Sequence, residues 1–259
     1  MSVLDSIIEG VLEEQSRREL SQSELAERIS AIGAPRNALA SLQGNPLSVI
    51  AEVKRSSPSK GSLAEIDDPA SLALRYQDGG ASVVSVLTEA RRFGGTLKDF
   101  TAVREKIEIP MLRKDFVVNE YLVRESRAFG ADLMLLIAAA LPGSLLQDLY
   151  ALGTELGMQI LVEVHDQDEL ERALAIKPKI IGVNARNLKT LEIDLSHFTT
   201  LIPQIPANIY RVAESGIATI SDVEMAAQAG ADAILVGETL VKSGNPEATI
   251  AEFLSVGKR

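Results

Sequence analysis

The stretch LSVIAEVK, residues 47–54, decides the fold, because it has the pattern of a buried strand that ends in two charges. Its mostly apolar first half is typical of a strand in a parallel sheet whose two faces are both covered. Glu52 and Lys54 are two residues apart, so in an extended strand their side chains point to the same face. The sequence therefore predicts a buried strand that presents opposite charges on one face, just before the loop RSSPSKG at residues 55–61.

The same pattern recurs along the chain, with longer segments of helical period between the apolar runs. The expected strands are residues 47–54, 82–88, 109–114, 132–138, 159–164, 179–184, 209–214 and 232–237. Alternating strands and helices favour a parallel sheet. Eight such units predict a closed (β/α)8 TIM barrel, a fold that typically takes about 250 residues. The first strand is not followed by the glycine-rich turn of a dinucleotide-binding open sheet.

Capping signals place helices between the strands. Asp68 precedes Pro69, which is favoured in a first helical turn, and Gly130 follows another helical segment as a stop signal. The expected helices are residues 69–78, 96–106, 120–129, 144–156, 168–175, 221–229 and 247–256, with a weak one near 195–202.

Residues 1–46 precede the first strand and contain helical stretches at residues 4–20 and 21–32. Ser21 and Glu24 have the spacing of a capping box. We expect a helical N-terminal extension packed on the barrel, within a single domain of residues 1–259.

Composition narrows the class of partner. The chain has a formal net charge of -10 and a pI near 4.9, so it is a poor candidate for binding nucleic acid or an anionic membrane. The absence of cysteine excludes disulfides and thiolate chemistry. The longest apolar run, residues 133–141, is far too short to span a membrane, and the N-terminus lacks a signal-peptide core. We expect a cytoplasmic protein that binds a small molecule, as a monomer or, alternatively, a weak dimer.

Polar side chains stand at the carboxyl ends of the expected strands, where the active sites of TIM barrels lie. A single charged residue at a strand end can belong to a buried ion pair that fixes the register of the strand. Six polar residues on five strands favour function, because burying so many charges is costly and opposite charges tune proton transfer. These candidates are Glu52, Lys54, Lys114, Glu163, Asn184 and Glu214.

Two glycine-containing loops, residues 213–217 and 235–240, follow the last two strands. In TIM barrels these loops often hold a phosphate through backbone N–H groups and a short helix N-terminus. Gly216 and Gly237 permit a close backbone approach, although both loops could be ordinary turns. The Glu238 side chain is expected to point away from a bound phosphate.

Other polar residues are given no chemical role. His165 and His197 are the only histidines; capping or solvation is expected for the first and exposure for the second. No spacing of His, Asp and Glu resembles a metal site, so the sequence does not support catalysis by a bound metal. Ser56, Ser57 and Ser59 have no histidine base nearby in sequence, which disfavours a nucleophilic serine.

Eight segments together resemble the indole-3-glycerol-phosphate synthase family, from about residue 47 to the C-terminus. They are IAEVKRSSPSKG (50–61), LTEARRFGGTL (87–97), LRKDFVV (112–118), ADLMLLIAAAL (131–141), LVEVHD (161–166), IGVNARNLKTLEID (181–194), VAESGI (212–217) and LVGETLVKSGNP (235–246). The resemblance implies a TIM barrel with a helical extension, without metal or organic cofactor. It implies conversion of 1-(2-carboxyphenylamino)-1-deoxyribulose 5-phosphate to indole-3-glycerol phosphate, CO₂ and water.

The resemblance also implies roles for individual residues. Lys114 is implied as the acid of ring closure, and Glu163 and Lys54 are candidates for the dehydration, with their division of labour open. Glu52 is implied to hold Lys54. Asn184 and Glu214 are implied to orient the substrate, and Arg186 and Ser57 to contact its carboxylate or phosphate. The implied phosphate contacts are Ser215, Gly216, Gly237 and Glu238. The residues implied around the aromatic ring are Phe93, Phe116 and Leu188.

The chain has no tryptophan. If the family uses an aromatic side chain in residues 1–46 to contact the substrate ring, that role is filled here by an aliphatic side chain or is lost. Two other functions fit the sequence less well. A phosphoribosylanthranilate isomerase would not require two strand-end lysines with three carboxylates. A non-catalytic sugar-phosphate sensor would be expected to lack Lys114 or Glu163, and both are present.

Overall fold

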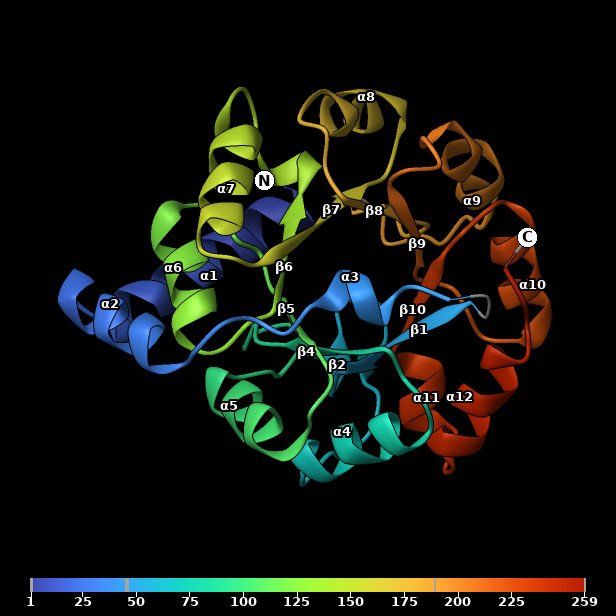
Figure 1. Ribbon diagram of the computed structural model, residues 1–259, viewed down its shortest axis with the longest axis horizontal. Coiled ribbons are helices and arrows are strands. Elements are labelled where there is room, and N and C mark those ends of the chain that lie inside the picture. Colours follow the sequence, from blue (N-terminus) through green and yellow to red (C-terminus); the bar gives the residue numbers. More distant parts are fainter. Residues whose placement is uncertain (1, 45–46, 189, 259) are drawn as a thin grey trace.

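A closed barrel of eight parallel strands forms the centre of the molecule (Figure 1). The structure is a computed structural model that describes residues 2–44, 47–188 and 190–258. Around the barrel the strands follow the order β1-β10-β9-β8-β7-β6-β5-β4, so the expected TIM barrel is confirmed. The barrel strands are β1 Ser48–Val53, β4 Val83–Leu87, β5 Met111–Lys114, β6 Leu133–Ile137, β7 Gln159–Val164, β8 Ile180–Asn184, β9 Tyr210–Glu214 and β10 Ala233–Val236.

Helices surround the barrel between successive strands, as Figure 1 shows. Asp68, the cap that the sequence indicates, accepts hydrogen bonds from the backbone N–H groups at the start of α4, and Thr96 caps α5. The helices of this ring are α4 Pro69–Asp78, α5 Leu97–Lys106, α6 Glu120–Ala128, α7 Leu145–Glu155, α8 Gln167–Ala175, α9 Ser196–Leu201, α10 Ile220–Gln228 and α12 Pro246–Leu254.

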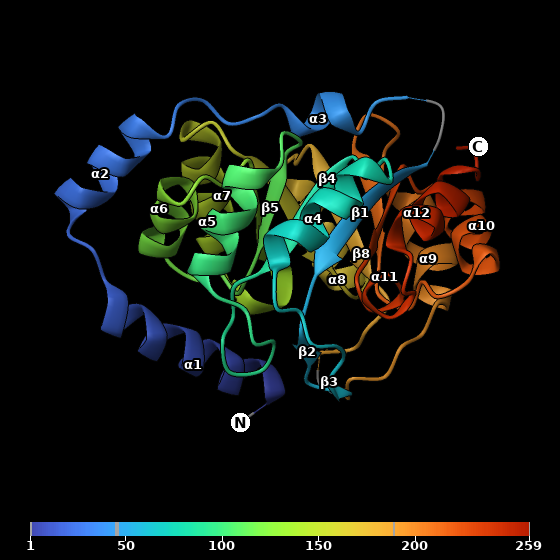
Figure 2. The same ribbon diagram turned by 90° about the horizontal axis from the view of Figure 1, so that it is seen from below.

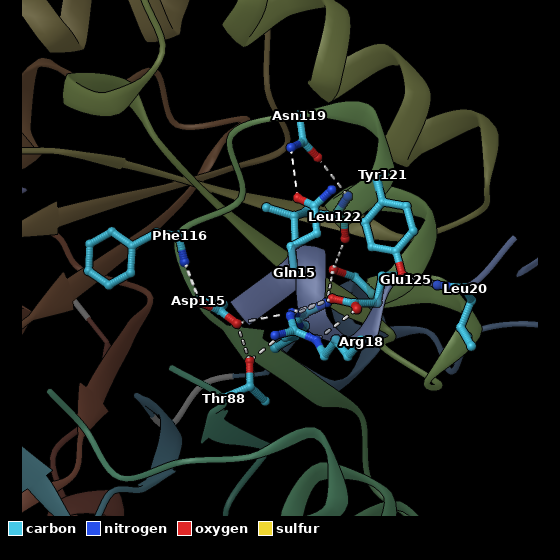
Figure 3. Close-up of polar contacts among 12 residues, drawn as sticks. Gln15, Arg18, Leu20, Thr88, Asp115, Phe116, Asn119, Tyr121, Leu122 and Glu125 are labelled. Atoms are coloured by element: carbon cyan, nitrogen blue, oxygen red, sulfur yellow. Dashed lines mark hydrogen bonds and ion pairs between the residues drawn. The ribbon is translucent and has the colours of Figure 1, made fainter. Parts of the chain in front are cut away.

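The N-terminal residues run along the outside of the barrel from one end to the other. They form α1 Val3–Arg18, α2 Gln22–Ala31 and α3 Ala38–Ser41. Figure 2 shows α1 at the end that also carries the hairpin β2 Ser56–Ser57 and β3 Gly61–Ser62, with α3 at the opposite end. Arg18 fixes the end of α1 by two hydrogen bonds to Glu125 of α6, 3.0 and 2.9 Å long, and Gln15 accepts one from Asn119 (Figure 3).

Several short elements were not predicted from the sequence. The β2–β3 hairpin pairs Ser56 with Ser62 and Ser57 with Gly61, which has a positive φ of 65°. Two-residue strands and single helical turns leave no periodic pattern to read. The other short elements are α3, the 3-10 helices η1 Ala138–Ala140 and η2 Ile202–Gln204, and α11 Glu238–Lys242.

Candidate active site

A cavity of about 830 Å³ lies at the carboxyl ends of the barrel strands. The structure brings all the predicted site residues to this one cavity; their roles stay predictions. The lining includes Glu52, Lys54, Ser57, Phe93, Lys114, Phe116, Glu163, Asn184, Arg186, Leu188, Glu214, Ser215, Gly216, Gly237 and Glu238.

Lys114 lies between two buried carboxyl groups that come from alternate strands of the barrel. Its Nζ is 3.0 Å from Oε2 of Glu163 on β7 and 3.7 Å from Oε2 of Glu214 on β9. Burial disfavours the charged ammonium, but the negative charges, chiefly of Glu163 and Glu214, outweigh burial and raise the pKa of Lys114 above its usual value. Lys114 is therefore charged at neutral pH, with a proton held near the cavity.

The two carboxyl groups differ in charge state although their side chains are equally buried, each 1% exposed. Burial raises the pKa of Glu163, but Lys114 and His165 outweigh burial, and the net pKa falls well below the usual range. Burial raises the pKa of Glu214, and repulsion from Glu163 adds to it, so this pKa lies well above the usual value. The pair thus combines one carboxylate with one neutral carboxylic acid.

The outward-facing residue beside Lys114 anchors β5. Because side chains alternate along a strand, Arg113 points away from the cavity, where it is fully buried. Its guanidinium donates to Asp115 and Glu125 at 3.0 and 2.9 Å, and Glu125 also binds Arg18 of α1. Figure 3 shows Arg18, Glu125 and Asp115 in this polar network, which fixes the strand end that carries Lys114.

Glu52 and Lys54 at the end of β1 point to the same face, as their spacing predicts. Lys54 Nζ donates to Oε1 of Glu52 over 2.5 Å. Gly237 lies directly beside this pair: a Cβ at Gly237 would stand 2.7 Å from Oε1 of Glu52 and 3.3 Å from Nζ of Lys54. A side chain at position 237 would therefore crowd this ion pair.

Asn184 and Arg186 connect the end of β8 to the loop after β1. The Asn184 side chain accepts the backbone N–H of Arg186 over 2.9 Å. The Arg186 guanidinium donates to Oγ of Ser59 in the β2–β3 turn, again over 2.9 Å. Ser57 is buried, and its Oγ has no hydrogen-bond partner among the described residues. The loop after β1 therefore lies across the mouth and adds polar groups to it.

The loop after β9 has an unusual backbone conformation. Ser215 adopts a φ of 67°, which is uncommon for a residue other than glycine, and Gly216 follows with a φ of 82°. A Cβ at Gly216 would stand 2.6 Å from Cδ2 of Leu195 and 2.7 Å from Cγ2 of Ile193. Such strained positions in sequence cluster at ligand sites.

Glu238, the first residue of α11, is held by two lysines. Its Oε1 accepts from Lys60 Nζ at 2.7 Å and from Lys242 Nζ at 2.9 Å. Burial raises the pKa of Glu238, but these two hydrogen bonds outweigh burial and lower it overall. The carboxylate near the expected phosphate loop is thus balanced by two cations, a feature that the sequence did not indicate.

An apolar wall lines another part of the cavity. The rings of Phe93 and Phe116 are 6.1 Å apart between centroids and tilted by 36°. Val3, Leu4 and Ile7 of α1 also line the cavity. The N-terminal helix therefore contributes aliphatic side chains, and these residues were missed because no motif marks them; their place on an amphipathic helix was the only available signal.

Both histidine expectations were wrong. The His165 side chain is only 9% exposed and lies between two carboxylates. Its Nδ1 is 2.9 Å from Oε2 of Glu169, and its Nε2 is 3.2 Å from Oε1 of Glu163. The packing of α8 against the end of β7, which the sequence does not reveal, brings these groups together. His197 is half-buried rather than exposed, because it lies in the first turn of α9 next to the buried Phe198.

Within residues 2–44, 47–188 and 190–258, no helix is both long and apolar enough to cross a membrane. Over the same ranges, no three His, Cys, Asp or Glu side chains gather in a way that could hold a metal ion.

An eight-stranded parallel barrel with paired lysines and carboxyl groups at its carboxyl-terminal mouth defines the class of TIM barrels whose mouth holds groups suited to acid–base chemistry. A family model described as indole-3-glycerol phosphate synthase matches residues 4–253. The chain belongs to the indole-3-glycerol phosphate synthase family.

Individual relatives agree with this assignment. Indole-3-glycerol phosphate synthase of Paenarthrobacter aurescens is 55% identical over 99% of this chain and 97% of the relative. The protein of the same name in Mycolicibacterium smegmatis is 52% identical over 99% and 95%. A solved N-acetylmannosamine-6-phosphate 2-epimerase from Clostridium perfringens covers 85% of this chain and 97% of its own, with a TM-score of 0.62 and 14% identity. That likeness supports the fold alone.

Proposed function

We propose that the chain converts 1-(2-carboxyphenylamino)-1-deoxyribulose 5-phosphate to indole-3-glycerol phosphate, CO₂ and water, the carboxy-lyase step of tryptophan biosynthesis. Family membership over nearly the full length supports this function. The observation that carries the mechanism is the charged Lys114 between Glu163 and Glu214 inside the cavity. The reaction transfers protons and forms and breaks carbon–carbon bonds without a net oxidation or reduction, so we expect no cofactor. We also propose that it takes place in the cytoplasm.

Ring closure requires an acid. The aromatic carbon that bears the carboxylate attacks the ketone carbon, and the ketone oxygen gains negative charge as the bond forms. Lys114 is a suitable donor, because its ammonium is charged and lines the cavity. A charge-assisted hydrogen bond to the developing oxyanion stabilises the transition state before the proton moves.

Decarboxylation follows, and it needs little help from an acid or base. The electrons of the bond to CO₂ return to the ring and restore its aromaticity. Phe93 and Phe116 provide an apolar wall for the ring, together with aliphatic side chains of α1. Arg186 lines the same cavity and is a candidate to orient the carboxylate before it is lost.

Dehydration needs an acid for the departing hydroxyl and a base that takes a proton from the ring CH2 beside the nitrogen, because that carbon loses one hydrogen as the indole double bond forms. Glu163 is ionised in the resting site, because its pKa is lowered against the effect of burial by Lys114 and His165. It is therefore suited to accept a proton. Lys54 is the candidate acid, positioned by Glu52. Glu214, as a neutral acid, can donate a hydrogen bond to a substrate hydroxyl.

The phosphate is proposed to lie at the loops after β9 and β10. Backbone N–H groups near Gly216 and Gly237 can approach a phosphate closely, since neither residue has a side chain. Lys60 and Lys242 compensate the charge of Glu238 beside these loops.

A single-turnover experiment separates the proposed steps, because ring closure precedes CO₂ release and dehydration follows it. Enzyme in excess over labelled substrate is quenched, and CO₂ and indole product are counted separately. Lys114→Ala should slow both, whereas Glu163→Gln and Lys54→Ala should release CO₂ ahead of indole formation. Coincident loss of CO₂ and indole in all three variants would contradict the assignment of Glu163 and Lys54 to dehydration.

A further inference from the structure

The only histidine close to the active site does not line the cavity but lies behind a residue that does. Glu163 contributes to the cavity surface, whereas His165 does not. The His165 ring contacts Oε1 of Glu163, and Lys114 contacts the other oxygen, Oε2. The two carboxylate oxygens of Glu163 thus face two different cationic groups, one in the cavity and one behind it.

The ring is also anchored from outside the barrel. Glu169 on α8 accepts the backbone N–H of His165 at 2.9 Å and lies 2.9 Å from Nδ1 of its ring. Glu169 is in turn placed by the cap of α8, because Asp166 accepts the backbone N–H of Glu169 over 2.9 Å. The order Glu169, His165, Glu163, Lys114 is therefore one continuous polar chain from α8 into the cavity.

The charges that face the imidazole come from two elements. They are the carboxylates of Glu163 on β7 and Glu169 on α8. The next charged groups, Lys114 of β5 and Glu214 of β9, are reached only through Glu163. Burial lowers the pKa of His165, but its interactions with Glu163 and Glu169 outweigh burial and raise the pKa to about 10.

We propose that His165 is a positioning residue whose imidazolium, anchored by Glu169, keeps Glu163 ionised and turns its second oxygen toward Lys114. The inference rests on the proposed function in assigning proton transfer to Glu163. It also explains which of two equally buried carboxyl groups is ionised. Glu163 has two cationic neighbours and Glu214 has one, so the single proton shared by this pair belongs on Glu214.

The protonation state of His165 can be measured without substrate. In His197→Gln protein labelled with ¹⁵N-histidine, His165 is the only histidine left. Its ring nitrogens should show the imidazolium pattern from about pH 6 to about pH 9, whereas an unperturbed histidine becomes neutral above about pH 6.5. A neutral ring at about pH 7.5 would overturn the proposal. Because no turnover is involved, this result is independent of whether the proposed reaction is right.

Kinetics test the effect on Glu163. In His165→Gln the amide can keep one hydrogen bond but not the positive charge, so the pKa of Glu163 should rise. We expect kcat to fall about 10- to 100-fold with little change in KM, because a displaced base weakens chemistry more than binding. The acidic limb of the kcat/KM profile should move to higher pH.

Two further variants keep the test decisive. Glu169→Gln removes the outer anchor and should shift the same acidic limb in the same direction, which serves if His165→Gln fails to fold. His197→Gln is the matched control and should keep the wild-type profile. A purely structural role for His165 would lower the melting temperature and leave the pH profile of the folded variants unchanged, and that result would refute the inference.

Discussion

Replacing Glu214 by glutamine tests the charge state of the site through protein stability. Glu214 is 1% exposed, and its carboxyl group can share a proton with the neighbouring Glu163 in a hydrogen bond. Burial, followed by repulsion from Glu163, raises its pKa well above the usual value although Lys114 acts in the opposite direction. Glutamine preserves the shape of the side chain and cannot ionise, so it mimics the neutral acid.

The sign follows from proton linkage. Because the folded-state pKa is raised, the native state keeps a proton that the unfolded state releases above about pH 4.3. The contribution of Glu214 to stability is complete below that pH and is lost as the pH rises toward the folded-state pKa. Each pH unit in this window lowers the free energy of unfolding by up to about 1.4 kcal/mol, relative to a protein whose side chain at this position does not titrate.

The stability of Glu214→Gln relative to the wild type should therefore increase as the pH rises from about 5 to about 8. The activity of the variant should be lower than that of the wild type. Urea unfolding at several pH values, followed by circular dichroism, measures the difference. Glu238→Gln is the control: its pKa is lowered against burial by Lys60 and Lys242, so its difference from wild type should be flat over this window. Parallel stability curves for wild type and Glu214→Gln would refute the assignment of a neutral Glu214.

Two further predictions concern the cavity walls. Gly237→Ala should raise KM and destabilise the fold by about 1–3 kcal/mol, since the new Cβ would stand 2.7 Å from Oε1 of Glu52. Steady-state kinetics measure the change in KM, and urea unfolding measures the change in stability. A wild-type KM would contradict the expected crowding. Leu4→Ala should raise KM about tenfold, because it removes an apolar contact with the substrate. Leu12 lies on the same helix but is 41% exposed and does not line the cavity, so Leu12→Ala should leave KM unchanged. Equal KM values for the two variants would exclude a role of α1 in binding.

Strand periodicity was sufficient to predict most of the barrel and much of the cavity lining. Alternation separates Lys114, which faces the cavity, from Arg113, which is buried behind it, and the ends of β8 and β9 bring Asn184 beside Glu214. These inferences need only the two-residue period of a strand and the closure of the barrel. The hydrophobic pattern is strong because nearly every strand residue is buried.

Contacts between side chains on different helices and strands could not be predicted from the sequence. The ion pair of Arg18 with Glu125 joins residues 107 apart, and no local pattern indicates it. The setting of His165 depends on how α8 packs after its cap, so a loop histidine of ordinary appearance turned out to be buried between carboxylates. The charge state of Glu214 depends likewise on Glu163 and Lys114 meeting in space.

The most direct measurement is the appearance of indole fluorescence when the purified protein meets the carboxyphenylamino ribulose phosphate with EDTA present, for wild type and Lys114→Ala. We expect turnover by the wild type. The variant should keep the circular dichroism spectrum and lose about 10²- to 10⁴-fold in kcat, the usual cost of a missing general acid. No wild-type turnover at any pH from about 6 to about 9, or a near-normal kcat in folded Lys114→Ala, would contradict the function or the central place of Lys114.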